Sequence, residues 1–156
     1  MKSEMEYKKD TRTKNLTLRD IHVGDWVQVW SETTERYSPP LKITQICDDG
    51  TIYLVTSDEE RCTPWEEDIK NVDALPIDAD LFRGFGFEVS DKDNDRGCLY
   101  QNITRNGKYV GQIRYPMNVK SYMRLCGYEC IYMHEYISYN YRNNIDIKLE
   151  WKGIER

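Results

Sequence analysis

The sequence contains few of the residues on which most catalytic and metal sites depend. Its 156 residues include only two histidines, His22 and His134. It has no glycine-rich phosphate loop, because Gly84-x-Gly86 is too short, and no serine in a nucleophile-elbow pattern. Because acid–base and nucleophilic chemistry need such groups close together, these absences argue against an organised catalytic site.

Long hydrophobic runs are also missing. The longest apolar runs have about five residues, whereas a membrane-spanning helix needs roughly 20. The first residues, MKSEMEYKKDTRTKN, are charged and lack the apolar centre of a signal peptide. We therefore predict a cytoplasmic protein that has no membrane partner.

The five cysteines are an odd number and form no Cys-x-x-Cys pair, so we expect reduced thiols rather than a disulfide framework. Cys126, Cys130 and His134 are spaced four residues apart and would share one face of a helix, where they could ligate zinc. However, Gly127 interrupts that helix and a fourth ligand is missing. Cys130 and His134 could also form a thiol nucleophile and its base. We predict no metal ligand, no catalytic residue and no cofactor.

The sequence is rich in tyrosine and tryptophan and uneven in charge. Its 12 Tyr and 4 Trp, with 39% hydrophobic residues, indicate a globular chain rather than a disordered one. Residues 21–95 carry 6 basic and 18 acidic side chains, whereas residues 96–156 carry 10 basic and 5 acidic ones. The acidic part should repel nucleic acid, and the basic part could tolerate it.

The first half predicts a small curled sheet. Alternation in VGDWVQVW, two apolar runs at Leu41–Cys47 and Thr51–Thr56, and a tight turn at Asp48-Asp49-Gly50 indicate a meander of short strands. We expect Ser31–Pro40 to be a polar loop and Ile69–Val72 to be a further short strand. The predicted domains are a flexible tail at 1–15, an SH3-like β-barrel lobe at 16–75 and an α+β lobe at 76–156 that packs on it.

The second half predicts a smaller antiparallel sheet with two helices. Asp78 as N-cap and Gly86 after the last turn place the first helix at 78–85. Asn106-Gly107 is a hairpin signal, because both residues tolerate positive φ. We expect a second helix over Met133–Asn143, with Met133, Tyr136, Ile137 and Tyr141 on one side. The alternating IDIKLEW at Ile145–Trp151 predicts a closing strand. The overall fold class is α+β with mostly antiparallel strands.

The order of these pieces resembles a group of small uncharacterised proteins from Bacteroidetes genomes, phages and mobile elements. The resemblance rests on Leu18–Val27, on the Pro76–Glu88 segment with Phe-Gly-Phe-Glu, and on Tyr-x-His-Glu at Tyr132–Glu135. It covers most of residues 16–151. It implies a phage or mobile-element origin, but it brings no known activity.

Three function classes follow from these patterns. We expect a non-enzymatic protein-interaction or accessory module with a protein partner, whose binding residues are Trp26, Trp30, Tyr37, Tyr53 and Trp65. The alternative is nucleic-acid binding through the C-terminal half, where Arg105, Lys108, Arg114, Lys120 and Arg124 alternate with Tyr109, Tyr115 and Tyr122. A cysteine-dependent enzyme built on Cys130 and His134 ranks third. The sequence leaves open whether the Trp/Tyr face is an interface or part of the core.

Overall fold

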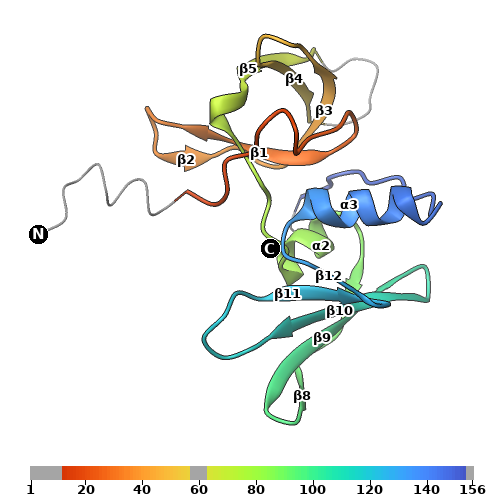
Figure 1. Ribbon diagram of the computed structural model, residues 1–156. Coiled ribbons are helices and arrows are strands. Elements are labelled where there is room, and N and C mark those ends of the chain that lie inside the picture. Colours follow the sequence, from red (N-terminus) through yellow and green to blue (C-terminus); the bar gives the residue numbers. More distant parts are fainter. Residues whose placement is uncertain (1–11, 57–62, 154–156) are drawn as a thin grey trace, which may run out of the picture. The chain divides into compact units, whose positions relative to one another are not determined.

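The computed structural model describes residues 12–56 and 63–153, which fall into two compact units (Figure 1). The described residues up to Leu75 form the first unit, and those from Pro76 onward form the second. Strands predominate in both units, and every strand pairing among the described residues is antiparallel. This confirms the predicted α+β fold class with mostly antiparallel strands.

The first unit is a curled, half-barrel sheet of short strands. Its elements are β1 (Trp26–Ser31), β2 (Arg36–Tyr37), β3 (Leu41–Ile46), β4 (Thr51–Val55), β5 (Trp65–Asp68), the 3-10 turn η1 (Ile69–Asn71) and β6 (Val72–Asp73). The strand order is β2-β1-β3-β4-β5, and β6 also pairs with β1. Along its length, β1 contacts β3, then β6, then β2. The sheet therefore has to bend around β1.

Local chemistry explains this meander. Gly50 has a φ of 93°, which glycine adopts without steric cost, and its turn joins β3 to β4 as predicted. The backbone N–H of Thr51 donates to the Asp49 carboxylate at 3.0 Å and fixes the same turn. The strands bury Leu41, Ile43, Ile52 and Leu54 completely. Burial of these apolar side chains supplies the main driving force for the first unit.

Two predicted segments of the first unit differ from the structure. The expected loop Ser31–Pro40 contains β2, which forms a hairpin with β1. The strand expected at Ile69–Val72 is mostly the η1 turn, because the Asp68 carboxylate accepts a hydrogen bond from the Lys70 N–H and caps it. β6 begins only at Val72.

Residues 12–15, which were predicted to belong to a flexible tail, form hydrogen bonds with the rest of the first unit. Asn15 forms a β-bridge with Asp73, and the N–H of Ala74 donates to the carbonyl of Lys14 at 2.8 Å. Arg12 donates to the Asp73 carboxylate. These residues thus form an arm along β6; the rest of the predicted tail lies outside the described residues.

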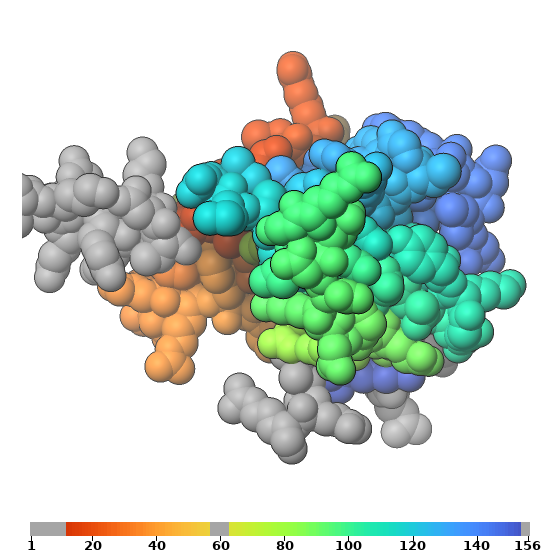
Figure 2. Space-filling view, turned by 90° about the horizontal axis from the view of Figure 1, so that it is seen from below, coloured from red at the N-terminus to blue at the C-terminus, as the bar shows by residue number. Residues whose placement is uncertain are grey.

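The second unit is an antiparallel sheet with two helices. Its elements are α2 (Ala79–Gly84), β7 (Glu88–Val89), β8 (Asp93–Asp95), β9 (Cys98–Arg105), β10 (Lys108–Tyr115), β11 (Tyr122–Leu125), β12 (Tyr128–Cys130) and α3 (Met133–Arg142). The strand order is β12-β11-β10-β9-β7, and β8 pairs with β9. Figure 1 shows both helices on one side of this sheet, and Figure 2 shows the β8–β9 hairpin (green) projecting toward the viewer from the other side.

Helix α2 and the central hairpin form as the sequence predicts. The Asp78 carboxylate accepts from the Leu81 N–H at 2.7 Å and caps the start of α2. Gly86, with a φ of 88°, ends the helix in a Schellman motif, in which the N–H of Phe87 donates to the carbonyl of Phe82. Asn106 and Gly107 both have positive φ, as a type I′ turn between β9 and β10 requires.

An aromatic cluster forms the centre of the second unit. The ring of Phe82 packs edge-on against Phe87 at 5.0 Å and against Tyr136 at 5.4 Å. All three side chains are buried. Edge-to-face pairs of this kind add to the stabilisation that burial alone gives. The cluster joins α2 to α3 above the sheet.

The closing strand predicted at Ile145–Trp151 is wrong, because this segment pairs with no strand of the described chain. It is held by side chains instead: Leu149 is buried, and the Trp151 ring lies edge-on to Phe85 at 5.1 Å. The Lys152 N–H also donates to the Gly84 carbonyl. The predicted apolar side of the second helix is wrong for Tyr141, which is 85% exposed.

Candidate functional site

A groove on the first unit brings together aromatic side chains from two separate parts of the chain. Its volume is about 620 Å³, and its walls come from β1, the β1–β2 turn, β2, β5 and η1. Trp30, Tyr37 and Trp65 supply the rings, and Glu32 and Glu67 are among the charged residues of the lining. We call this the aromatic groove.

The β1–β2 hairpin forms one wall of the aromatic groove. Trp30 and Tyr37 are direct partners in this hairpin, and their rings meet edge-on with centroids 4.9 Å apart. Cross-strand aromatic pairs stabilise antiparallel sheets. Trp65, the first residue of β5, also lines the groove and is 41% exposed, so its ring is accessible to a ligand.

The structure brings together three of the five predicted binding residues. The exceptions are Trp26, which is buried at the start of β1, and Tyr53, which lies on β4 opposite Glu66 and outside the groove lining. Repulsion by the Glu66 carboxylate raises the pKa of the Tyr53 phenol. Trp30 is itself largely buried, so Trp65 is the groove tryptophan that presents most surface to solvent.

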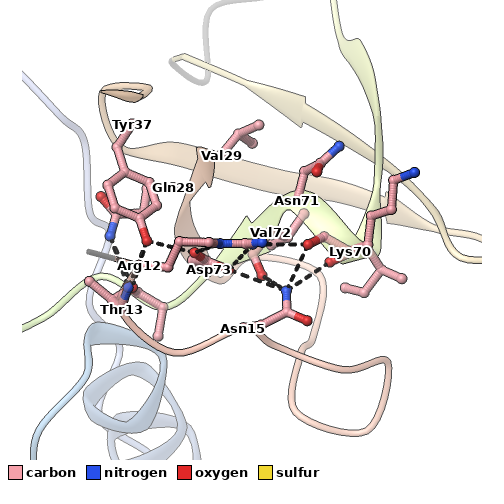
Figure 3. A network of polar contacts seen from close by, with 12 residues as sticks. Arg12, Thr13, Asn15, Gln28, Val29, Tyr37, Lys70, Asn71, Val72 and Asp73 are labelled. Carbon is pink, nitrogen blue, oxygen red and sulfur yellow. Dashed lines mark hydrogen bonds and ion pairs between the residues drawn. The ribbon is translucent and has the colours of Figure 1, made fainter. Parts of the chain in front are cut away.

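A buried carboxylate holds the tyrosine of the groove (Figure 3). The Tyr37 hydroxyl donates to the Asp73 carboxylate at 2.6 Å, and Arg12 donates to the same carboxylate through Nε at 2.9 Å and Nη2 at 2.6 Å. The Thr13 N–H donates to the Tyr37 hydroxyl oxygen at 2.7 Å. Burial, followed by the bond to Asp73, raises the pKa of Tyr37. We call Arg12, Thr13, Asn15, Tyr37 and Asp73 the Asp73 network.

Sequence reasoning missed the Asp73 network because its members are far apart in the chain. Arg12 and Asp73 are separated by 61 positions, and residues 12–15 have no hydrophobic periodicity. The sequence around Asp73 does contain a signal that this carboxylate needs a partner. Asp73 follows Val72 and precedes Ala74-Leu75, and a carboxylate in so apolar a segment needs a partner when it is buried.

The surroundings of Cys130 do not favour the thiolate that the enzyme hypothesis needs. Burial raises the pKa of the Cys130 thiol to about 12, with a smaller contribution from Glu135, so the thiol stays protonated at neutral pH. A nucleophilic thiol needs the opposite shift. The His134 ring is buried and stacks on Tyr132. Within residues 12–56 and 63–153, no three His, Cys, Asp or Glu side chains are grouped so that they could hold a metal ion.

The second sheet has a polar and aromatic face opposite its helices. Arg114 pairs in register with Tyr100 on β9 and with Tyr122 on β11, so these three side chains form one row across the sheet. Arg124 pairs with Gln112 in the next row. Arg114 also lies 3.3 Å from the Asp95 carboxylate. We call this the open sheet face.

The structure divides the predicted nucleic-acid-binding residues. Arg114, Arg124 and Tyr122 share the open sheet face. Tyr115 is on the other face, where its hydroxyl donates to the Gln101 side chain. Arg105 lies over the Phe87 ring and donates to the Lys148 carbonyl, and Lys120 contacts the Tyr132 hydroxyl. Only part of the predicted set can therefore contact one ligand on this sheet.

No protein-family model, no curated protein and no solved structure matches this chain. The resemblance to proteins of Bacteroidetes and their phages stays a prediction. Among the helices that the structure describes, none is both long enough and apolar enough to span a membrane.

Proposed function

We propose that the protein is a non-enzymatic interaction module that binds a segment of a partner protein in the aromatic groove. The observation that carries this proposal is the meeting of Trp30, Tyr37 and Trp65 from two separate segments in one accessible groove. Tryptophan and tyrosine contribute most of the binding energy in many interfaces, because they offer large, rigid contact surfaces. The groove is large enough for several side chains of a bound segment.

The proposal includes an SH3-like identity for the first unit. Three features support it: the antiparallel meander from β1 to β5, the 3-10 turn η1 that follows, and the return of β6 to β1. The aromatic groove is lined by the β1–β2 hairpin and by β5, which stand at the two ends of the strand order.

Peptide selection on the purified protein tests the proposed function. Short random peptides that bind the wild type are recovered, and their affinities are then measured for Trp65→Ala. We expect this variant to lose at least about tenfold in affinity, as is typical of an aromatic hot spot. Binding should also shift the tryptophan emission, since Trp30 and Trp65 line the groove.

A matched control distinguishes binding in the aromatic groove from non-specific binding to exposed aromatic residues. Tyr109 is an aromatic residue on β10 of the second unit and is 64% exposed. Tyr109→Ala should leave the affinity of the selected peptides unchanged. If Trp65→Ala binds them as tightly as the wild type does, the aromatic groove is not the interface.

A second candidate function is the binding of single-stranded nucleic acid on the open sheet face. The observation that favours it is the row of Tyr100, Arg114 and Tyr122, since aromatic rings stack with bases and arginine contacts phosphates. However, Asp95 already neutralises Arg114, and Glu129 pairs in register with Arg124. We therefore rank this function second.

Fluorescence anisotropy with a labelled single-stranded oligonucleotide at low salt tests the second candidate. Binding should weaken steeply as salt is added, because phosphate contacts release counterions. Arg124→Gln should weaken it further, whereas Arg142→Gln on helix α3 serves as the matched control. A lack of binding at low salt would remove this candidate.

A further inference from the structure

The aromatic groove has the chemistry of a receptor for a positively charged side chain. We propose that the segment bound there is basic, and that a lysine or arginine side chain inserts among Trp30, Tyr37 and Trp65, where Glu32 and Glu67 offset its charge. This inference rests on the proposed function, because it names the class of partner that the same groove binds.

The aromatic walls supply the first part of the argument. The electron-rich faces of indole and phenol rings attract ammonium and guanidinium groups, and tryptophan attracts them most strongly. Two of the three groove rings are indoles; Trp65 presents 41% of its surface to solvent, whereas Trp30 is buried beside Tyr37 and presents only 8%. Tyr37 is held in place by the bond from its hydroxyl to Asp73. The receptor is therefore partly preorganised, which lowers the entropic cost of binding.

Charge supplies the second part of the argument. The lining itself carries two carboxylates, Glu32 and Glu67, and two cations, Arg36 and Lys70. Glu35, in the β1–β2 turn beside the lining, adds a third carboxylate. The Glu67 carboxylate accepts a hydrogen bond from the Asn71 side chain at 2.8 Å, which fixes it on the groove wall. These carboxylates can pair with the cations of a basic segment, and an acidic segment would find no such advantage.

The sequence extends the same imbalance to the rest of the first unit. Residues 21–75 contain 4 basic and 12 acidic side chains, so a basic partner would be drawn toward this unit from a distance. Nucleic acid would be repelled by the same field. An uncharged segment would gain only the aromatic contacts. A basic protein segment is thus the occupant that uses both features of the groove.

Three synthetic peptides that differ only in carrying Lys, Gln or Glu at alternate positions test the inference. Binding is followed by NMR on the indole N–H signals of Trp30 and Trp65 in the full chain. We expect the Lys peptide to bind at least about tenfold more tightly than the Gln peptide, as cation–π and ionic contacts together allow. The Glu peptide should not shift these signals.

Variants then assign the effect to the groove. Glu67→Gln should weaken the Lys peptide about three- to tenfold, whereas Asp48→Asn, the same loss of charge in the β3–β4 turn, should change its affinity less than about twofold. Trp65→Phe should bind the Lys peptide more tightly than Trp65→Ala does, because a phenyl ring keeps part of the cation–π attraction.

The possible outcomes separate this inference from the proposed function. If the Lys and Gln peptides bind equally well at the groove, the basic partner is wrong and the interaction module stands. If Asp48→Asn weakens binding as much as Glu67→Gln does, only diffuse charge attracts the peptide, and the inference is again wrong. If no peptide of any charge shifts the Trp30 and Trp65 signals, and selection recovers none that does, the proposed function itself fails.

Discussion

In the first unit, hydrogen bonds to a buried carboxylate join segments that are distant in sequence. In the second unit, contacts between buried aromatic rings join such segments. Asp73 is fully buried, and its carboxylate accepts hydrogen bonds from Arg12 in the arm at residues 12–15 and from Tyr37 in β2. In the second unit, Phe82, Phe87 and Tyr136 hold helix α2 against α3. The two units are of similar length but distribute their stabilising contacts differently.

The two kinds of contact suit the different shapes of the two sheets. Hydrophobic contacts are non-directional and tolerate small shifts, so the cluster suits a sheet with two helices on one face. Hydrogen bonds to a buried carboxylate are directional and become costly when they are broken. They suit the first unit, where the sheet must curl and the ring of Tyr37 must keep one orientation.

The largest expected effect is on the aromatic cluster. Phe82→Ala removes a fully buried ring, and we expect the free energy of unfolding of the second unit to fall by about 3–5 kcal/mol. This loss is measured by denaturant-induced unfolding, with hydrogen exchange of the backbone amides in β9 and β10 as the probe. Leu99→Ala, at a half-exposed position on β9, should cost much less. A loss below about 1 kcal/mol for Phe82→Ala would contradict the role assigned to the cluster.

A smaller effect is expected from the Asp73 network. Arg12→Ala leaves the buried Asp73 carboxylate without its charge partner, and we expect the first unit to lose about 2–3 kcal/mol, since Arg12 is partly exposed. Arg12→Lys should restore only part of this loss, because an ammonium cannot reproduce the two-pronged contact. Hydrogen exchange in β1 and β6 is the measurement.

Arg19→Ala is the control for the arm, because Arg19 is an exposed cation in the turn before β1. If Arg12→Ala is as stable as the wild type, another group offsets the charge of the buried Asp73 carboxylate. Buried polar contacts would then not be what holds the arm to the first unit.

The smallest expected effect is the pH dependence conferred by Asp25. Burial raises the pKa of Asp25 to about 6, from 3.8, while the bond from the His22 N–H opposes the shift. The folded state therefore binds a proton near pH 6 that the unfolded chain binds only near pH 4. The first unit should gain about 1–2 kcal/mol as the pH falls from 7 to 5, and lose it as the pH rises again.

Asp25→Asn should remove this dependence, and thermal unfolding across the pH range measures it. The His22 imidazole Nδ1 lies 3.8 Å from the Asp25 carboxylate, so His22→Ala is needed to separate the contributions of the two groups. The same slope in Asp25→Asn would show that another group titrates.

Sequence reasoning succeeded where the signal was local. The Asp78 cap, the Gly86 terminus, the Asn106-Gly107 turn and the Gly50 turn depend on residues next to one another, and all four occur. It failed for Ile145–Trp151, because alternation indicates a strand but cannot show whether a sheet edge is available to pair with it. This segment is instead held in place by the packing of Trp151 on Phe85.

The candidate site shows the same limit. Trp30, Tyr37 and Trp65 could be chosen by residue type, and two of them are cross-strand partners. Trp26 and Tyr53 have the same residue types but lie elsewhere, since the curl of the sheet, rather than strand alternation alone, decides which rings reach the groove. The contribution of Arg12 depends on a contact across 61 positions, which local patterns do not encode.

Strand β5 has one further consequence, which concerns self-association. It ends the strand order of the first sheet, and three of its four residues are carboxylates: Glu66, Glu67 and Asp68. Two copies of such an edge would bring like charges together, so unwanted pairing between molecules is disfavoured at neutral pH. Acid or high salt weakens this repulsion. Glu67, which would favour a basic ligand in the groove, therefore also helps to disfavour aggregation through this sheet edge.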